Sequence, residues 1–251
     1  MKPIVILEMA NNHMGSILHA KKIIESFYTI TKNYSSKIDF VLKYQFRDRE
    51  NFIHKDFYNS NDKFIERFKS TFLSDSDWNS LIKFSRKYFK LACTPFDEVS
   101  VDKVFEKKFD FLKIASCSIT DWPLIEYIEK KYKKQKKNII ASLGGLNEND
   151  IIKVTSFFQN RKIDISFLYC VAKYPTKLSE LNLSYFFRLR EKYGRRILGF
   201  SSHEDTDITL SPAIAYSAGA RIFEKHVGFE TEKVKLNAYS VKPNELKLWL
   251  D

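Results

Sequence analysis

The chain has 251 residues, of which 42 are Lys or Arg and 31 are Asp or Glu, so its formal net charge is +11. Hydrophobic residues make up 44% and aromatic residues 15%, which excludes a disordered chain. Only 7 Gly and 6 Pro exclude collagen-like and low-complexity sequences. No apolar stretch approaches the roughly 18 residues that span a bilayer, and no signal-peptide core develops, so we expect a cytoplasmic protein without a membrane partner.

Much of the excess positive charge lies in residues 130–138, KKYKKQKKN, a pattern typical of a solvated helix end. No nucleic-acid-binding motif or interleaved aromatic pattern accompanies it, so we expect no nucleic-acid partner. Cys93, Cys117 and Cys170 lie in apolar runs without the spacing of metal ligands, which favours reduced thiols over a disulfide framework.

Short apolar runs rich in β-branched residues alternate along the chain with longer amphipathic stretches. The runs predict strands over 4–9, 40–45, 90–96, 111–116, 138–144, 165–171, 197–203 and 221–227. The amphipathic stretches predict helices over 16–32, 75–89, 97–107, 121–134, 147–160, 180–193, 207–218 and 242–250. Ser74 and Asn147 stand where helix-capping residues are expected. The segment 46–73 is longer and aromatic-rich, and indicates an excursion after the second strand.

Strands that alternate with helices imply right-handed βαβ units and a parallel sheet. Eight such units predict closure into an α/β fold of the (β/α)8 TIM-barrel type. No linker rich in Pro, Gly or Ser interrupts the pattern, so we expect a single barrel domain over residues 1–251.

Polar residues occupy the carboxyl ends of the predicted strands, where the active sites of such barrels lie. They are Glu8, Lys43, Gln45, Thr94, Asp97, Lys113, Ser116, Ser142, Tyr169, Ser201, His203, Glu224 and His226. Side chains two positions apart on a strand share a face, so several of these residues are expected to point into one cavity. The alternative is that polarity simply resumes where strands end, but eight such ends together favour a functional site.

Two histidines, His203 and His226, end consecutive strands, which lie about 4.8 Å apart in a sheet. As neutral imidazoles they can hold one divalent cation, while water or substrate oxygens complete its shell. Glu8 or Glu224 can add a ligand or orient an imidazole. The competing interpretation is that both histidines are structural.

Lys43 and Lys113 lie inside otherwise apolar strands, where an unpaired charge would be costly. One explanation is pairing with an internal carboxylate such as Glu8 or Asp97. The other is a phosphate or carboxylate ligand, which points to a small phosphorylated acid. Hydroxyl groups that could assist belong to Ser116, Ser142 and Ser201.

Nine blocks of the sequence, in order and with similar spacing, resemble the N-acetylneuraminate (sialic acid) synthase family. They are EMANNHMGSILHAKKII (8–24), LKYQ (42–45), CTPFDEVSVD (93–102), LKIASCSITDWPLIEYI (112–128), SLGGL (142–146), YCVAKYPT (169–176), LNL (181–183), GFSSH (199–203) and FEKHVG (223–228). The resemblance implies condensation of phosphoenolpyruvate with an aldose, an N-acylated hexose or its relative. It further implies a sialic-acid-like 2-keto-3-deoxy sugar acid and inorganic phosphate as products, and a divalent metal, manganese or magnesium.

The resemblance also assigns roles to individual residues. It makes His203 and His226 the metal ligands and Glu8 the acid–base residue. The residues that it assigns to phosphoenolpyruvate are Lys43, Lys113, Ser116, Ser142 and Ser201. Those that it assigns to the sugar acceptor are Gln45, Tyr174 and Asn182.

The sequence departs from the family pattern at several positions. Ser118 and Ser202 replace acidic residues, although Glu204 and Asp205 follow the second of these positions. The segment 236–240, LNAYS, replaces an Asp-His-x-x-Ser pattern whose Asp normally helps to bind the sugar, so the acceptor is expected to differ from N-acetylmannosamine. The sequence ends at Asp251, so we expect the family's C-terminal antifreeze-like domain to be absent. In the family's dimers this domain contributes an arginine to the partner's active site; a homodimer is left open.

Two alternatives remain open from the sequence. One is a related 3-deoxy-ulosonate phosphate synthase, whose phosphorylated acceptor would need basic residues at the mouth, for which Arg47 and Arg49 are candidates. The other is an inactive barrel that acts as a binding or scaffold protein, against which the presence of both histidines, both lysines and Glu8 counts strongly.

Overall fold

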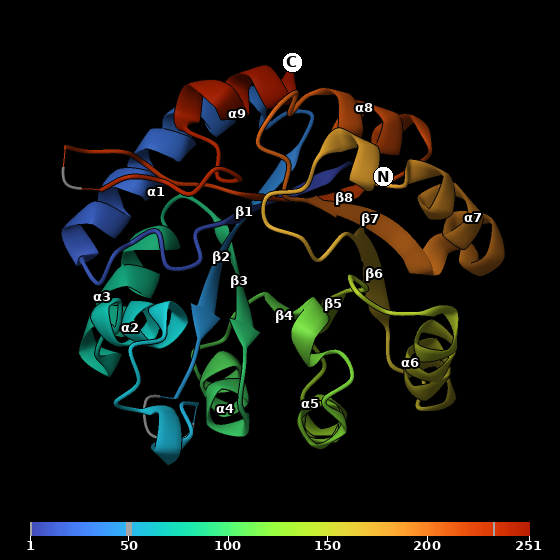
Figure 1. The fold of residues 1–251 in the computed structure, drawn as a ribbon, viewed down its shortest axis with the longest axis horizontal. Coiled ribbons are helices and arrows are strands. Elements are labelled where there is room, and N and C mark those ends of the chain that lie inside the picture. Colours follow the sequence, from blue (N-terminus) through green and yellow to red (C-terminus); the bar gives the residue numbers. More distant parts are fainter. Residues whose placement is uncertain (1, 49–51, 233) are drawn as a thin grey trace.

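The computed structural model describes residues 2–48, 52–232 and 234–251. The described residues confirm the TIM barrel: eight parallel strands close into one barrel, in which β1 pairs with both β2 and β8. Figure 1 shows the helices arranged around the outside of these strands. The strands are β1 (Ile4–Glu8), β2 (Asp39–Phe46), β3 (Lys90–Pro95), β4 (Phe111–Ile114), β5 (Asn138–Ser142), β6 (Ile165–Cys170), β7 (Ile197–Ser202) and β8 (Ile222–His226).

The predicted helices are present, with ends that differ from the predicted ones by a few residues. They are α1 (Ile17–Thr31), α3 (Asp75–Ser85), α4 (Glu98–Glu106), α5 (Trp122–Lys134), α6 (Glu148–Asn160), α7 (Leu183–Tyr193), α8 (Leu210–Ser217) and α9 (Pro243–Leu250). The two capping residues expected from the sequence are confirmed. Ser74 and Asp77 form a reciprocal capping box at α3, and the Asn147 side chain accepts a hydrogen bond from the Asp150 N–H at α6.

The excursion after β2 contains two elements that the sequence did not predict. These are a single 3₁₀ turn at Lys55–Phe57 and the short helix α2 (Lys63–Ser70). The Asp62 side chain caps α2 by accepting hydrogen bonds from the N–H groups of Phe64 and Ile65. This excursion brings α2 beside the carboxyl ends of the strands, where two of its cationic side chains line the cavity described below.

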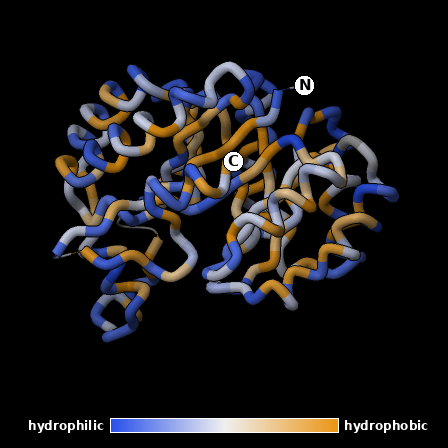
Figure 2. The backbone as a smooth tube through the Cα atoms, turned by 90° about the horizontal axis from the view of Figure 1, so that it is seen from above, coloured by the Kyte–Doolittle hydropathy of each residue, from blue (hydrophilic) through white to orange (hydrophobic). Residues whose placement is uncertain are grey.

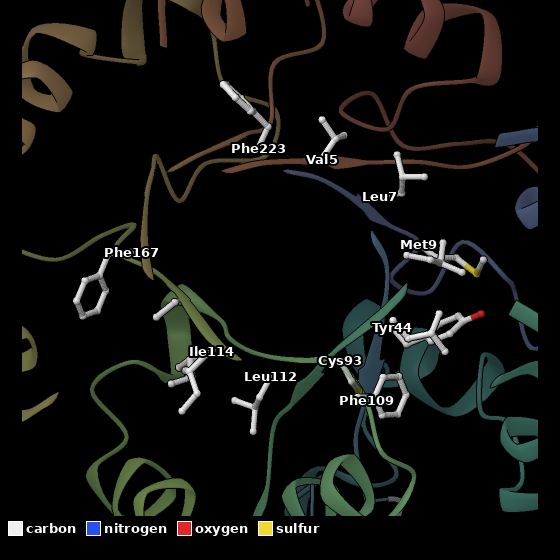
Figure 3. Close-up of a cluster of buried hydrophobic side chains, with 14 of the residues drawn as sticks. Val5, Leu7, Met9, Tyr44, Cys93, Phe109, Leu112, Ile114, Phe167 and Phe223 are labelled. Carbon is white, nitrogen blue, oxygen red and sulfur yellow. The ribbon is translucent and has the colours of Figure 1, made fainter. Parts of the chain in front are cut away.

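Alternation along the strands separates two apolar layers. The barrel interior holds a small cluster that comprises Ile6, Val41, Ala92, Ile140, Leu168 and Ile222. The intervening residues, such as Val5, Leu7 and Tyr44, point away from the middle of the barrel and pack against the helices (Figure 3). Because successive side chains alternate, Glu8 follows Ile6 and Lys43 follows Val41 on the interior face. The barrel interior therefore changes from apolar to charged toward the carboxyl ends.

A buried ion pair holds the carboxyl end of β7 against β8. The Lys225 ammonium lies 3.2 Å from Glu204 Oε2, both side chains are fully buried, and Lys225 also donates to the Glu204 carbonyl at 3.1 Å. The other carboxylate oxygen of Glu204 accepts a hydrogen bond from Ser211 of α8. These contacts tie together the two strand ends that carry His203 and His226.

Hydrophobic residues concentrate on the strands and polar residues on the outside (Figure 2). Within the described residues, no helix has both the length and the apolar character that crossing a bilayer requires.

We expect Glu204→Gln to lower the free energy of unfolding by about 3 kcal/mol, because it leaves the buried Lys225 ammonium without its carboxylate. Urea denaturation measures this change. Glu180→Gln is the matched control: it breaks the exposed pair with Lys173, so no measurable change is expected. Equal midpoints for the two variants would contradict a structural role for the buried pair.

Candidate active site

A cavity of about 1000 Å³ opens at the carboxyl ends of the strands. It brings together the predicted site residues Glu8, Lys43, Gln45, Lys113, Ser116, Ser142, Tyr174, Ser201, His203 and His226. Asn182 is the exception. It is exposed, precedes α7 and accepts a hydrogen bond from the Ser184 hydroxyl, so the structure does not bring it to the cavity.

Four buried charges form one network at the base of this cavity. Lys43 Nζ lies 2.5 Å from Glu8 Oε2 and 2.8 Å from Glu224 Oε2. Lys113 Nζ lies 3.8 Å from the other oxygen, Oε1, of Glu224. Glu224 therefore bridges the two lysines. Of the two carboxylates suggested by the sequence, Glu8 pairs with Lys43, whereas Asp97 caps α4 and accepts from the Asp48 N–H.

The network shifts the pKa values of the two carboxyl groups in opposite directions. Burial disfavours the charge of Glu224, but Lys113 and Lys43 outweigh it and lower the Glu224 pKa to about 2. For Glu8, burial outweighs the attraction of Lys43, and the pKa is raised above its ordinary value. Burial also lowers the pKa of Lys113 to about 8, because the attraction of Glu224 offsets it only in part and the charge of Lys43 lowers the pKa further. Glu224 is thus a fixed anion, while Glu8 takes up a proton more readily than an ordinary glutamate.

The three predicted serines surround the lysines. Lys113 donates a hydrogen bond to Ser142 Oγ at 2.7 Å. Ser201 Oγ donates to Glu224 Oε1 at 3.3 Å, and Ser116 Oγ accepts from the Gly144 N–H at 3.0 Å. The hydroxyls and ammonium groups therefore form a compact set of donors that suits a small anion.

The two strand-end histidines face each other, with ring centroids 5.3 Å apart. His203 Nδ1 lies 3.3 Å from the Val171 carbonyl and 3.9 Å from Cys170 Sγ. Because a carbonyl only accepts, its contact is a hydrogen bond in the tautomer that has the proton on Nδ1, and that tautomer leaves a lone pair on Nε2. His226 Nδ1 is buried and has no hydrogen-bond partner among the described residues. Burial lowers the pKa of both rings to about 3, so they are neutral at pH 7.

Neutral imidazoles with available lone pairs fit a divalent cation. Among residues 2–48, 52–232 and 234–251, no cluster of three or more His, Cys, Asp or Glu side chains is arranged to hold a metal ion. The donor set thus suits a cation whose remaining ligands come from water or from a substrate.

Two tyrosines pack against the histidines. The Tyr174 ring lies 4.2 Å from the His203 ring, and Tyr239 meets the His226 ring edge-to-face at 5.0 Å. Tyr239 belongs to the LNAYS segment that departs from the family pattern, and its site position was not foreseen. It follows no periodic pattern, so only a comparison at this position could have found it.

Several further cavity residues escaped the sequence analysis because they lie in loops or in the excursion, among them Asn12, Arg67 and Tyr239. Cys170, which ends β6, also lines the cavity, although the sequence indicated only a reduced thiol there. Asn12 joins two loops by donating to the Val227 carbonyl at 2.8 Å and to Ser240 Oγ at 3.1 Å. Arg47, suggested as a cation of the mouth, does line the cavity, whereas Arg49 lies outside the described residues.

The fold and site together define a TIM-barrel protein with a charged, metal-compatible cavity at the carboxyl ends of its strands. Residues 29–250 match the NeuB family model, and the chain belongs to that family.

Individual relatives agree with this assignment. A pseudaminic acid synthase of Campylobacter jejuni is 30% identical over 274 aligned positions, which cover 100% of this chain and 72% of the relative. The crystal structure of a Chromobacterium violaceum protein assigned to spore coat polysaccharide biosynthesis has a TM-score of 0.93 at 39% identity, covering 99% of this chain and 73% of the other. The N-acetylneuraminic acid synthetase of Leptospira borgpetersenii has a TM-score of 0.83 at 25% identity, covering 100% and 82%.

We expect Lys43→Met to lower the free energy of unfolding by about 3 kcal/mol at pH 7, because Glu8 and Glu224 lose the cation between them. Without Lys43, the lowered pKa of Glu224 rises and the already raised pKa of Glu8 rises further, so the loss shrinks as the pH falls and the carboxyls become protonated. Urea denaturation at pH 5 and pH 7 measures both effects. Lys2→Met, which breaks the exposed pair with Asp39, is the control; a pH-independent loss in Lys43→Met would contradict the electrostatic explanation.

Proposed function

We propose that the protein condenses phosphoenolpyruvate with an aldose of the N-acylhexosamine kind. The products are a sialic-acid-like 2-keto-3-deoxy sugar acid and inorganic phosphate. The observation that carries the proposal is the pairing, within one cavity, of two buried lysines surrounded by hydroxyls with two neutral histidines. The names of the relatives support the same class of reaction, since they are synthases of pseudaminic, legionaminic and N-acetylneuraminic acids.

Phosphoenolpyruvate is assigned to the lysine end of the cavity. Lys43 and Lys113 supply positive charge, while Ser116, Ser142 and Ser201 supply hydrogen-bond donors to the phosphate and carboxylate. An entering anion takes over interactions that the ammonium groups now make with Glu8 and Glu224. This end therefore holds the substrate in a fixed orientation relative to the histidines.

The aldose is assigned to the histidine end. A divalent cation held there by His203 and His226 would polarise the aldehyde of the acceptor. Tyr174 and Tyr239 form an apolar wall beside the two imidazoles, and Gln45 offers an amide to a sugar hydroxyl. The walls and the amide orient the aldehyde carbon toward C3 of phosphoenolpyruvate.

The reaction then proceeds through ordinary polar steps. C3 of phosphoenolpyruvate attacks the aldehyde carbon and leaves positive character at C2. Water adds to C2, and the resulting tetrahedral intermediate breaks its C–O bond to expel phosphate. Glu8 lines the same cavity and is assigned to exchange a proton with the alkoxide or with the water, because burial raises its pKa above that of an ordinary glutamate and so favours uptake of a proton.

Incubation with phosphoenolpyruvate, Mn²⁺ and a panel of hexosamines and related aldoses tests the proposal. We expect phosphate release that requires both the aldose and the metal, and a product whose mass equals the sum of phosphoenolpyruvate, aldose and water minus phosphoric acid. Phosphate assay and mass spectrometry measure the two products. A panel in which no aldose stimulates phosphate release would refute the proposed reaction and favour a barrel that only binds.

The histidine assignment is tested by metal binding, separately from turnover. We expect His203→Ala and His226→Ala each to weaken Mn²⁺ binding by more than roughly tenfold, as measured by electron paramagnetic resonance. His54→Ala, which changes an exposed histidine of the excursion, is the control and should bind Mn²⁺ as the wild type does. Undiminished binding in both site variants would remove the histidines from the metal site.

A further inference from the structure

A second group of cations lines the cavity, apart from the lysine network. Arg47 follows the end of β2, while Lys63 and Arg67 come from α2. All three line the same cavity as Lys43 and Lys113, but they belong to the excursion that forms its rim. We name this group the rim cations.

The rim cations differ from the lysines in their counter-charges. Lys43 and Lys113 are compensated by Glu8 and Glu224. In the part of the chain that the structure describes, no carboxylate forms an ion pair with any rim cation.

The nearby acids are otherwise engaged. Asp121, the third acidic residue that lines the cavity, caps α5 by accepting from the Leu124 N–H. On α2 itself, Asp62 caps the helix, and Glu66 does not line the cavity. Among the described residues, the rim cations therefore have no carboxylate within ion-pair distance, and Glu8 and Asp97 act on Arg47 only through longer-range attraction.

Phenylalanine rings pack against the Arg47 guanidinium, and not all of its N–H groups have a hydrogen-bond partner among the described residues. Its guanidinium lies 4.1 Å from the ring centre of Phe96, 4.5 Å from that of Phe68 and 5.3 Å from that of Phe52. One amino group donates to Gln45 Oε1 at 2.7 Å, while Nε is buried and has no partner among the described residues. Burial lowers the pKa of Arg47 to about 10, so it remains charged at pH 7. A desolvated guanidinium with an unmatched donor is suited to an anionic acceptor.

Arg67 converges on the same region from α2. Among the described residues, its guanidinium donates only one hydrogen bond, a long one of 3.5 Å to the Asn11 carbonyl. Arg67 and Arg47 both act on the buried His13, where burial and then these two charges lower the His13 pKa to about 3. Both arginines line the cavity, so they lie in one region of its rim.

The spacing along β2 relates the rim to the lysine network. Lys43 and Gln45 occupy alternate positions and both line the cavity, and Arg47 continues the same alternation. At about 3.3 Å per residue, Arg47 stands roughly 13 Å beyond Lys43 along the strand direction. Gln45 lies between them and contacts Arg47. If a sugar is bound between Lys43 and Arg47, the end of the sugar that is remote from Lys43 therefore lies at the rim.

We propose that the rim cations Arg47, Lys63 and Arg67 bind an anionic substituent, a phosphate or a carboxylate, carried by the acceptor sugar at the end remote from its aldehyde. This inference rests on the proposed condensation, and it narrows the acceptor from neutral aminosugars to anionic ones. Arg47 and Arg67 make the directional contacts, and the exposed Lys63 adds charge that attracts the acceptor to the mouth.

A matched set of three acceptors tests the proposal: a neutral N-acylhexosamine, its 6-phosphate and the corresponding uronic acid. We expect kcat/KM for one or both anionic acceptors to exceed that for the neutral sugar by about tenfold or more, the value of one charge-assisted hydrogen bond. The preferred member of the anionic pair identifies the substituent as phosphate or carboxylate. Phosphate release from phosphoenolpyruvate measures each rate.

Substitution of the two arginines tests whether the rim cations cause the preference for an anionic acceptor. Arg67→Gln and Arg47→Gln should each reduce the ratio of anionic to neutral kcat/KM about tenfold or more, mainly through KM. Lys55→Gln, which removes an exposed charge of the same excursion away from the cavity, should leave the ratio unchanged.

Three results would overturn the inference. One is a wild-type protein that prefers the neutral acceptor. Another is a ratio that stays constant in both arginine variants. If no acceptor stimulates phosphate release, the condensation is refuted, and binding is measured by calorimetry instead. The third result is then that neither the 6-phosphate nor the uronic acid binds to the wild type. Binding of either anion that Arg67→Gln weakens would instead support the rim site without the reaction.

Discussion

The charged network of Lys43, Glu8, Glu224 and Lys113 is the constraint on which the site depends. Four ionisable side chains are buried within a barrel whose interior also holds an apolar cluster below them. Such charges are tolerable only when each has a partner in good geometry, because the low-dielectric interior penalises any unpaired ion. Barrel closure supplies that geometry: β1 lies between β2 and β8, and Glu8 is in register with both Lys43 and His226.

This arrangement gives the two ends of the cavity different electrostatic characters. At the base, the positive charges of the lysines are compensated, so an anionic ligand competes with Glu8 and Glu224 for the same ammonium groups. The histidines beside them are neutral because burial keeps protons off their rings. At the rim, Arg47 and Arg67 have no described carboxylate partner and are held by aromatic rings and a carbonyl instead. At the base, the charges of the lysines are thus balanced by the two glutamates. At the rim, the described arginines have no carboxylate in an ion pair with them.

Most of the fold and the base of the site followed from the sequence, for a physical reason. Buried parallel strands require continuous β-branched and aromatic runs, and the positions where these runs end are where side chains reach the cavity. Lys43 and Lys113 were conspicuous because a charge inside an apolar run demands a partner. Glu224 was noticed as a possible ligand or orienting group, but its bridge between the lysines depends on β8 closing against β1, which no local pattern specifies.

Apart from Arg47, which was a candidate cation of the mouth, the rim could not be predicted in the same way, because it is built from a segment without a repeating pattern. The excursion 46–73 shows neither strand alternation nor a long helical period, and α2 was missed since only eight residues form it. Loops that connect strands to helices are free to vary without disturbing the barrel, whereas the strand ends are fixed by packing. The residues proposed to choose an acceptor therefore lie where sequence patterns are weakest. The residues proposed to hold phosphoenolpyruvate lie where the barrel itself determines their positions.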